Sequence, residues 1–248
     1  MAALTWDADG ERLFETGVDR VVLYLMNNDG TYANGKAWNG VTGITESPEG
    51  ADANDIYADN IKYLSLISKE DWKGTIKAFT YPEEFNACMG NVTKNAIKTF
   101  IGQQTRKKFA ISWRSLLGND TVGDKFAYKL HLAWGLSAAP SEMDHATQND
   151  SPEAQEFSWE VSSIPPQTSE KIYVGGDDEA ANQRAIQPCA HVFVTSKIII
   201  PGETPTTNAF CTALENVLYG GVSTNPTIPT LTQLIKFCKN GGSTFPPV

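Results

Sequence analysis

The pentapeptide Gly135-Leu136-Ser137-Ala138-Ala139 is the closest approach in this chain to the nucleophile elbow of a serine hydrolase. Such an elbow needs a strand that turns sharply into a helix, with glycine on both sides of an exposed serine. Here Ala139 replaces the second glycine, a long amphipathic strand precedes the serine, and a loop is expected after it. We therefore do not expect Ser137 to be catalytic.

The histidines and the first acidic turn do not form a recognisable metal site. His131, His145 and His191 lack the i, i+4 spacing of a helical metal site, and two of them fall in predicted strands. The segment Asp7-Ala8-Asp9-Gly10 is half of a calcium loop but lacks the third acidic residue and the distal Glu, so it predicts a turn. We expect no bound metal.

Two acidic pairs, Glu83-Glu84 and Asp177-Asp178, could supply the carboxylates of a glycosidase. Any acidic protein offers such pairs, however, and the sequence gives these two no priority. No glycine-rich phosphate cradle precedes a predicted helix. The sequence therefore predicts a protein that is not an enzyme and that carries no cofactor.

Cys88, Cys189, Cys211 and Cys238 lie far apart and form no C-x-x-C pair. This spacing argues against a zinc ribbon or a redox motif. We expect all four to be buried or half-buried thiols in a reducing compartment.

Length and charge limit the remaining classes. The chain has 248 residues and a net charge of -9, which favours a single domain over residues 1–248 and argues against binding to DNA or anionic lipid. The longest apolar run, Val21 to Met26, is far shorter than the roughly 20 residues that span a bilayer. Residues 1–10 lack the features of a secretory signal, so we expect synthesis in the cytoplasm and no membrane association.

Period-two alternation of apolar and polar residues predicts a mainly β fold, because successive side chains of a strand point to opposite faces. The pattern is clearest in the run Phe126, Tyr128, Leu130, Leu132 and Trp134, with Lys125, Lys129 and His131 on the other face. Further strands are expected at 19–26, 36–45, 61–68, 73–81, 108–114, 157–162 and 189–196.

Helices are few. The apolar residues between Thr207 and Tyr219 recur at helical spacing, with Thr206 or Thr207 as the N-cap and Gly220-Gly221 as the stop. A shorter helix is expected from about Leu231 to Lys239, and a single turn after Pro82. The predicted fold is thus a β-sandwich or barrel with one flanking helix and a short C-terminal helix.

Long, polar, acidic connections are expected at 46–59, 137–156 and 166–188. Connections longer than about 15 residues are unusual in a compact domain unless they bind something. The first is either a solvated, mobile loop or a contact loop, about 45–59, that orders against a neighbouring subunit. In the second case its contact residues are Glu46, Glu49, Asp52, Asp55, Tyr57 and Asp59.

A β protein without a catalytic site must cover its strand edges or use them for pairing. Identical subunits that meet head to tail close into rings when the rotation divides evenly, and rings can stack into a tube. We therefore expect a structural subunit that assembles with copies of itself.

Several stretches resemble the major tail tube protein of long, non-contractile (siphovirus-type) bacteriophage tails. They cover well over half of the chain and read GVDR from Gly17, NGVTGITESPEGADANDIYADNIKYL from Asn39, GTIKAFTYPEEFNAC from Gly74, SWRSLLGNDT from Ser112, YKLHLAWG from Tyr128, SAAPSE from Ser137 and NDSPEAQEFSWEVS from Asn149. The chain departs from the family at 167–187, at 198–205 and in the tail from Gly241, within a C-terminal extension of about 240–248. These differences affect the variable loop of 166–188 and the C-terminal contacts.

The resemblance implies hexameric rings that stack into a hollow tube, with the 45–59 loop gripping the adjacent ring. It also implies a place in the virion, synthesis in the host cytoplasm, and three kinds of partner besides further copies: a tape measure protein in the lumen, a tail terminator and tail-tip proteins. Genomic DNA would pass through without specific binding. An acidic lumen wall would repel the DNA phosphates over a layer of about 8 to 10 Å, one Debye length.

Other classes remain open at this point. The same architecture could serve as the inner tube of a contractile tail or of a secretion or bacteriocin needle. A monomeric β-sandwich that binds carbohydrate would display exposed aromatic clusters, whereas most tryptophans here fall on predicted core faces. An unrecognised hydrolase would depend on Ser137.

Overall fold

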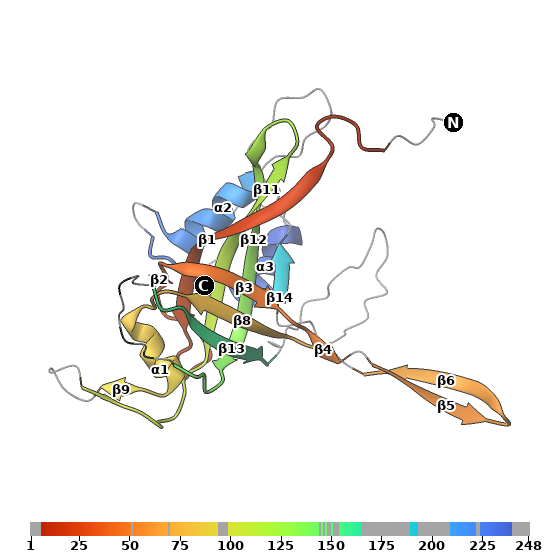
Figure 1. Cartoon of the computed structure of the whole chain (residues 1–248), viewed down its shortest axis with the longest axis horizontal. Coiled ribbons are helices and arrows are strands. Elements are labelled where there is room, and N and C mark those ends of the chain that lie inside the picture. Colours follow the sequence, from red (N-terminus) through yellow and green to blue (C-terminus); the bar gives the residue numbers. More distant parts are fainter. Residues whose placement is uncertain are drawn as a thin grey trace.

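The computed structural model describes residues 6–50, 52–68, 70–93, 99–143, 145, 147, 150, 154–164, 189–192, 209–221 and 224–239. Within them the fold is mainly β with a few short helices, as the alternation predicts (Figure 1). The expected variable loop 166–188, the C-terminal extension 240–248, residues 193–196 and the proposed caps Thr206 and Thr207 lie outside the described residues.

One antiparallel sheet forms the body of the molecule, in the order β2-β1-β11-β12-β13-β8-β3, with β14 also paired to β12. Its strands are β1 (Leu13–Leu25), β2 (Lys36–Ala37), β3 (Val41–Glu46), β8 (Lys73–Ala78), β11 (Phe109–Asn119), β12 (Gly123–Ala138), β13 (Phe157–Ser163) and β14 (Cys189–Val192).

A short connection joins the two ends of the strand order. β2 and β3 are at opposite ends of this order but are separated in the chain only by residues 38–40. Gly40 has a φ of +76°, which a residue with a Cβ adopts only under strain, and it lets the chain turn here from the β1 side to the β8 side. The result is a sandwich-like β arrangement, as the sequence predicts.

An aromatic cluster fills the interior. Phe85, at the end of the 3-10 helix η1 (Glu83–Phe85), is fully buried, and its ring centroid lies 4.5 Å from that of Trp38, 5.2 Å from Trp159 and 5.4 Å from Phe109. The helix α1 (Asn86–Met89) follows directly, so the single turn expected after Pro82 is confirmed. Such tilted and edge-on ring pairs are favourable beyond the area that they bury.

Two helices cover the outer face of β1, β11 and β12 (Figure 1). α2 (Ala209–Tyr219) and α3 (Leu231–Lys239) begin and end close to the predicted positions. Leu214 and Leu218 of α2 pack on this face, and Trp134 of β12 donates a hydrogen bond of 2.9 Å from Nε1 to the Pro229 carbonyl. At the start of α3, Thr230 and Gln233 form a reciprocal capping box.

The central strands are therefore buried on both faces, which corrects the expectation that their polar face meets solvent or a partner. On β12, Leu132 and Trp134 lie under the helices, while His131 is only 7% exposed and stacks on Trp113 with ring centroids 5.0 Å apart. The alternation correctly predicted which residues share a face of the strand. It did not predict that the face with small and polar residues is also buried.

Two strand boundaries differ from the prediction because of backbone irregularities. β1 begins at Leu13 instead of Asp19, since bulges near Gly17 and Arg20, both with positive φ, interrupt its alternation. The single strand expected at 36–45 is divided into β2 and β3 by the turn at Gly40.

No helix in the described part of the chain is both long and apolar enough to cross a membrane.

Candidate assembly interface

Residues 46–59 do not form the expected loop. They supply one side of a two-stranded arm that continues the β3–β8 pair away from the body (Figure 1). β4 (Glu49–Gly50) pairs with β7 (Glu70–Asp71), and β5 (Ala53–Ala58) pairs with β6 (Ile61–Ile67). We call residues 49–71 the arm.

The arm is closed by a two-residue turn, Asp59-Asn60, in which both residues have positive φ, 51° and 64°. This is the type I′ geometry that matches the twist of a hairpin and that Asn and Asp tolerate best. A bulge beside Ile56 and Tyr57 makes Tyr63 an extra residue of β6. The turn and the register fix which side chains share a face.

The two faces of the arm differ in chemistry. Directly opposed residues of a hairpin project to the same side, so the pairs Asn54–Leu66, Ile56–Leu64 and Ala58–Ile61 form one face. The other face carries Asp55, Lys62 and Ser65, with Tyr57 and Ile67. We call the side chains of Ile56, Ile61, Leu64 and Leu66 the apolar face of the arm.

All four side chains of the apolar face are exposed: Ile56 by 40%, Ile61 by 63%, Leu64 by 36% and Leu66 by 54%. A two-stranded hairpin is marginally stable at best in water, and contiguous apolar patches of this kind mark interaction sites. Figure 1 shows the β5–β6 hairpin extending away from the body of the molecule. The arm therefore reaches well beyond its own core.

Two of the six predicted contact residues hold the root of the arm. Glu46, the last residue of β3, accepts a hydrogen bond of 3.0 Å from Nε1 of the buried Trp72. Glu49 accepts one of 2.5 Å from Lys73 Nζ, and this interaction raises the pKa of Lys73. These contacts connect the root of the arm to Trp72 and to the start of β8.

The other four predicted residues are on the outer part of the arm. Asp52 and Tyr57 are exposed, and Asp59 is in the turn. Asp55 accepts hydrogen bonds from Lys62 at 2.7 Å and from Ser65 at 2.6 Å, and these contacts lower its pKa. Their role in a contact between rings stays a prediction.

The apolar face itself was missed by the sequence analysis. Its residues in β6 were predicted as a strand, but β5 was assigned to a loop because Asp52, Asn54, Asp55 and Asp59 dominate the segment. The available signal was Asp59-Asn60 between two stretches that each contain alternating apolar residues.

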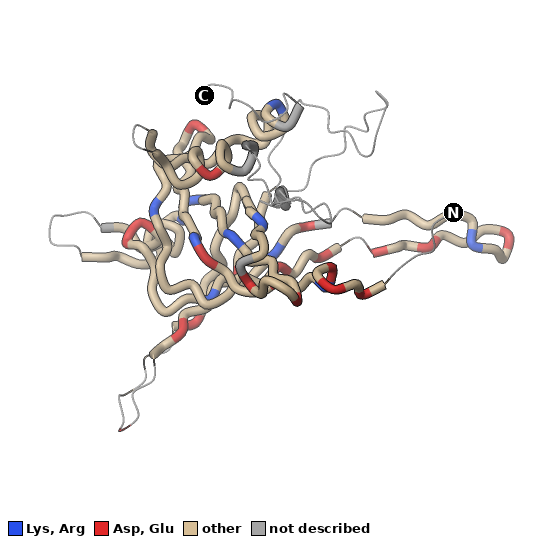
Figure 2. The backbone as a smooth tube through the Cα atoms, turned by 90° about the horizontal axis from the view of Figure 1, so that it is seen from above, with Lys and Arg blue, Asp and Glu red and all other residues tan. Residues whose placement is uncertain are grey.

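A second, smaller hairpin projects at the other end of the long axis of the molecule, as both views show (Figures 1 and 2). It pairs β9 (Val92–Thr93) with β10 (Phe100–Ile101). Phe100 is 40% and Ile101 is 50% exposed. Beside it is an open recess of about 450 Å³, which we call the far-end recess, lined by Leu25, Ala87, Val92, Phe100 and Lys107 with Glu83, Glu84, Asn86 and Asn91.

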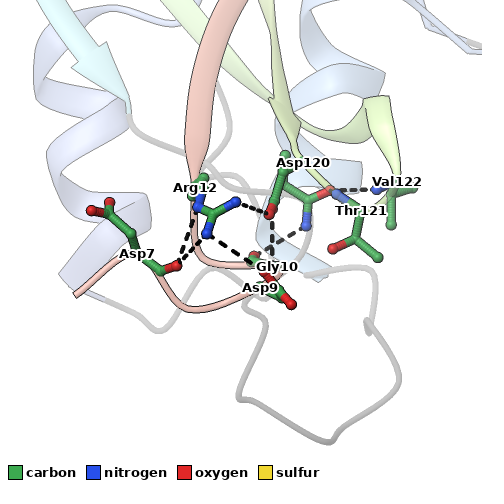
Figure 3. Close-up of polar contacts among 8 residues, drawn as sticks. Asp7, Asp9, Gly10, Arg12, Asp120, Thr121 and Val122 are labelled. Carbon is green, nitrogen blue, oxygen red and sulfur yellow. Dashed lines mark hydrogen bonds and ion pairs between the residues drawn. The ribbon is translucent and has the colours of Figure 1, made fainter. Parts of the chain in front are cut away.

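The N-terminal acidic segment is a turn, as predicted (Figure 3). Arg12 donates hydrogen bonds to the Asp7 carbonyl at 2.8 and 3.1 Å and lies 3.5 Å from Asp9 and 3.6 Å from Asp120. The Gly10 amide donates to Asp120 at 3.0 Å. These contacts connect the start of β1 to the β11–β12 turn. The carboxylates of Asp9 and Asp120 are engaged by Arg12 and by the Gly10 amide.

The remaining candidates for chemistry are built into the sheet. Ser137 is inside β12, opposite Ser162 of β13, and not on a strand-to-helix turn. His131 shares a hydrogen bond of 2.8 Å with Ser115, and Glu84 pairs with Lys36 at 3.0 Å. Among the described side chains, no group of three or more His, Cys, Asp or Glu residues could hold a metal ion.

Cys88 is a buried thiol, as expected, and burial raises its pKa to about 12. The side chains of Cys189, Cys211 and Cys238 lie outside the described residues, as do Asp177 and Asp178.

Comparisons with known proteins give little further guidance. No family model matches the chain, and no curated protein matches it in sequence. Among solved structures, the chain is similar to a component of the "anti-feeding prophage (AFP) baseplate, 6-fold symmetrised", with 11% identity over 65% of this chain and 94% of that one, and a TM-score of 0.25. A TM-score this low does not show a shared fold.

Proposed function

We propose that this chain is the major tail tube subunit of a long, non-contractile bacteriophage tail. Its copies form hexameric rings, and the rings stack into a hollow tube that conducts genomic DNA from the head to the host. Support comes from the stretches that resemble this family and from a fold that is mainly β. The proposal includes the absence of catalytic activity.

The observation that carries the proposal is the apolar face of the arm. Ile56, Ile61, Leu64 and Leu66 are on a hairpin that is too thin to bury them against itself and that points away from its own core. Their burial requires another molecule, and each large aliphatic side chain contributes about 1.5 to 3 kcal/mol when fully buried. Repeated subunits supply this second molecule.

The proposed partners follow from the same role. Further copies of the chain form the wall, a tape measure protein occupies the lumen during assembly, and terminator and tail-tip proteins bind the two ends. The subunit is a component of the virion.

Electron microscopy of the purified protein at rising concentration, with its mass in solution recorded alongside, tests the proposal. We expect rings and then hollow tubes of uniform diameter with six subunits per ring. A chain that stays monomeric at every concentration, and also when assembled tail tips are added, would refute the role.

A matched pair of arm variants tests the surface that drives assembly. Leu66→Asp places a charge on the apolar face, so the concentration needed for assembly should rise roughly tenfold or more. Ile67→Asp introduces the same charge at the next residue, whose side chain is on the opposite face of the hairpin. This variant should assemble like the parent. Equal effects of the two changes would contradict the assignment of the apolar face.

A further inference from the structure

The far-end recess has preformed walls. The Lys107 amide donates a hydrogen bond of 3.0 Å to the Ala87 carbonyl, and the Gln104 amide donates one of 2.9 Å to the Gly90 carbonyl, so the segment before β11 is fixed along α1. Gly90 permits this close approach, since a Cβ there would lie 2.7 Å from the Gln104 oxygen. A site with fixed walls loses little conformational entropy when it binds.

The chemistry of the recess complements the arm. Its apolar lining, with exposed Phe100 at the edge, matches the aliphatic side chains of the apolar face. Lys107 lines the recess together with Glu83 and Glu84, whereas the arm, residues 49–71, contains six carboxylates and two lysines.

The positive charge of Lys107 is available for a partner. Within the described residues, no carboxylate is at ion-pair distance from Lys107. Of the two rim carboxylates, Glu84 is neutralised by Lys36 at 3.0 Å, which lowers its pKa. On the arm, Asp52 and Asp59 are exposed.

The placement of the two surfaces is compatible with a head-to-tail contact. The arm and the β9–β10 hairpin, beside which the recess lies, project from opposite ends of the long axis (Figures 1 and 2). In a head-to-tail contact, the arm of one copy binds the recess of a second, the first copy keeps its own recess and the second keeps its own arm. A head-to-tail contact of this kind adds copies without limit unless a rotation closes it.

We propose that the far-end recess is the receptor for the arm of another copy of this chain, with the apolar face packed against Phe100, Val92 and Leu25, and with Lys107 beside the arm carboxylates. This inference rests on the proposed function and specifies which surface of the neighbouring subunit the arm grips.

Cross-linking between two variants tests the contact directly. Leu66→Cys and Phe100→Cys are made in chains of different mass, mixed, assembled and treated with a short bis-maleimide, with the parent chain as the background for the native cysteines. We expect a mixed dimer on a denaturing gel. Val122→Cys, on the exposed β11–β12 turn, replaces Phe100→Cys in the control and should give none.

A second measurement does not depend on cysteine chemistry. Phe100→Asp and Lys107→Glu should each raise the concentration needed for assembly, by about tenfold for Phe100→Asp, while Val122→Asp leaves it unchanged. Thermal unfolding of each variant checks that the fold is retained.

The outcomes separate the two proposals. Tubes that form normally from Phe100→Asp, or a cross-link from Leu66→Cys to Val122→Cys in place of Phe100→Cys, overturn the receptor and leave the tube intact. A parent chain that forms neither rings nor tubes overturns both.

Discussion

At the scale of single residues, Tyr24 connects the sheet to α2. Its buried hydroxyl donates a hydrogen bond of 2.7 Å to the Leu218 carbonyl and lies 3.2 Å from the Ser112 hydroxyl. The aromatic ring supplies apolar contact and the hydroxyl satisfies the carbonyl near the end of the helix.

Tyr24→Phe should therefore lower the free energy of unfolding by about 1 to 2 kcal/mol, because it leaves a buried carbonyl without its donor. Urea unfolding followed by tryptophan fluorescence measures the change. Tyr57→Phe removes the same hydroxyl from an exposed position on the arm and should have no effect. A similar loss in both variants would show that the Leu218 contact is not the cause.

Glu15 makes a second local network, between β1 and the strands β11 and β12. Its carboxylate accepts hydrogen bonds from Lys129 and from Ser115. Partial burial raises the pKa of Glu15, but the Lys129 and Ser115 contacts outweigh this effect and hold the pKa below its ordinary value of 4.5.

A lowered pKa in the folded state means that the ionised form stabilises the fold above about pH 4.5, and that this contribution is lost as the pH falls through the folded pKa. Glu15→Gln should be less stable than the parent at pH 7, by less than about 1 kcal/mol since the side chain is partly exposed. The difference should shrink in unfolding experiments at pH 3.5. Glu11→Gln, at an exposed position, should match the parent at both values, and a difference for Glu15→Gln that grows in acid would contradict the mechanism.

At the scale of elements, the strands that were predicted well carry large side chains on one face and polar ones on the other. β13 alternates Phe157, Trp159 and Val161 with exposed polar residues, and its predicted limits agree with the structure to within one residue. α3 was located equally well, because its apolar stripe has helical spacing and Gly241-Gly242 follows it.

The elements whose limits were predicted wrongly depend on single residues with unusual backbone conformations. Such residues leave no periodic pattern of apolar and polar side chains in the sequence. The bulges near Gly17 and Arg20 interrupt the alternation in the first half of β1, so this half was not predicted. The turn at Gly40 divides one expected strand into two. The β6 side of the arm was predicted as a strand, whereas the β5 side was assigned to a loop because acidic residues dominate 46–59. The candidate site was predicted in the right segment through its charge, but its apolar contact face became visible only with the register of β5 and β6.

Removal of the arm separates folding from assembly. Replacing residues 52–68 by a short Gly-Ser turn should leave the thermal midpoint of the monomer unchanged, because these residues belong to none of the three hydrophobic core clusters. Assembly should be abolished. Differential scanning calorimetry and electron microscopy measure the two effects, and a large fall in the midpoint would show that the arm supports the fold of its own subunit.

At the scale of the whole molecule, charge determines how the chain meets nucleic acid. The net charge is -9, and DNA carries about one negative charge per 1.7 Å of axis. Binding through the release of counterions needs a basic surface that such a chain does not provide overall.

Duplex DNA mixed with the assembled protein at physiological salt should therefore migrate through a gel at the rate of free DNA. An equally concentrated basic protein serves as the positive control. Retarded DNA whose mobility recovers at higher salt would show that a basic surface dominates and would remove the basis for passive conduction.

The arm and the far-end recess have a consequence for any polymer that they build. A filament of such subunits is polar: one terminus displays unoccupied arms, and the other displays unoccupied recesses. The two termini are chemically different, so a single capping protein cannot block both. Growth from a nucleus that offers only recesses would then proceed in one direction, because each added subunit buries its arm and displays a new recess at the advancing front.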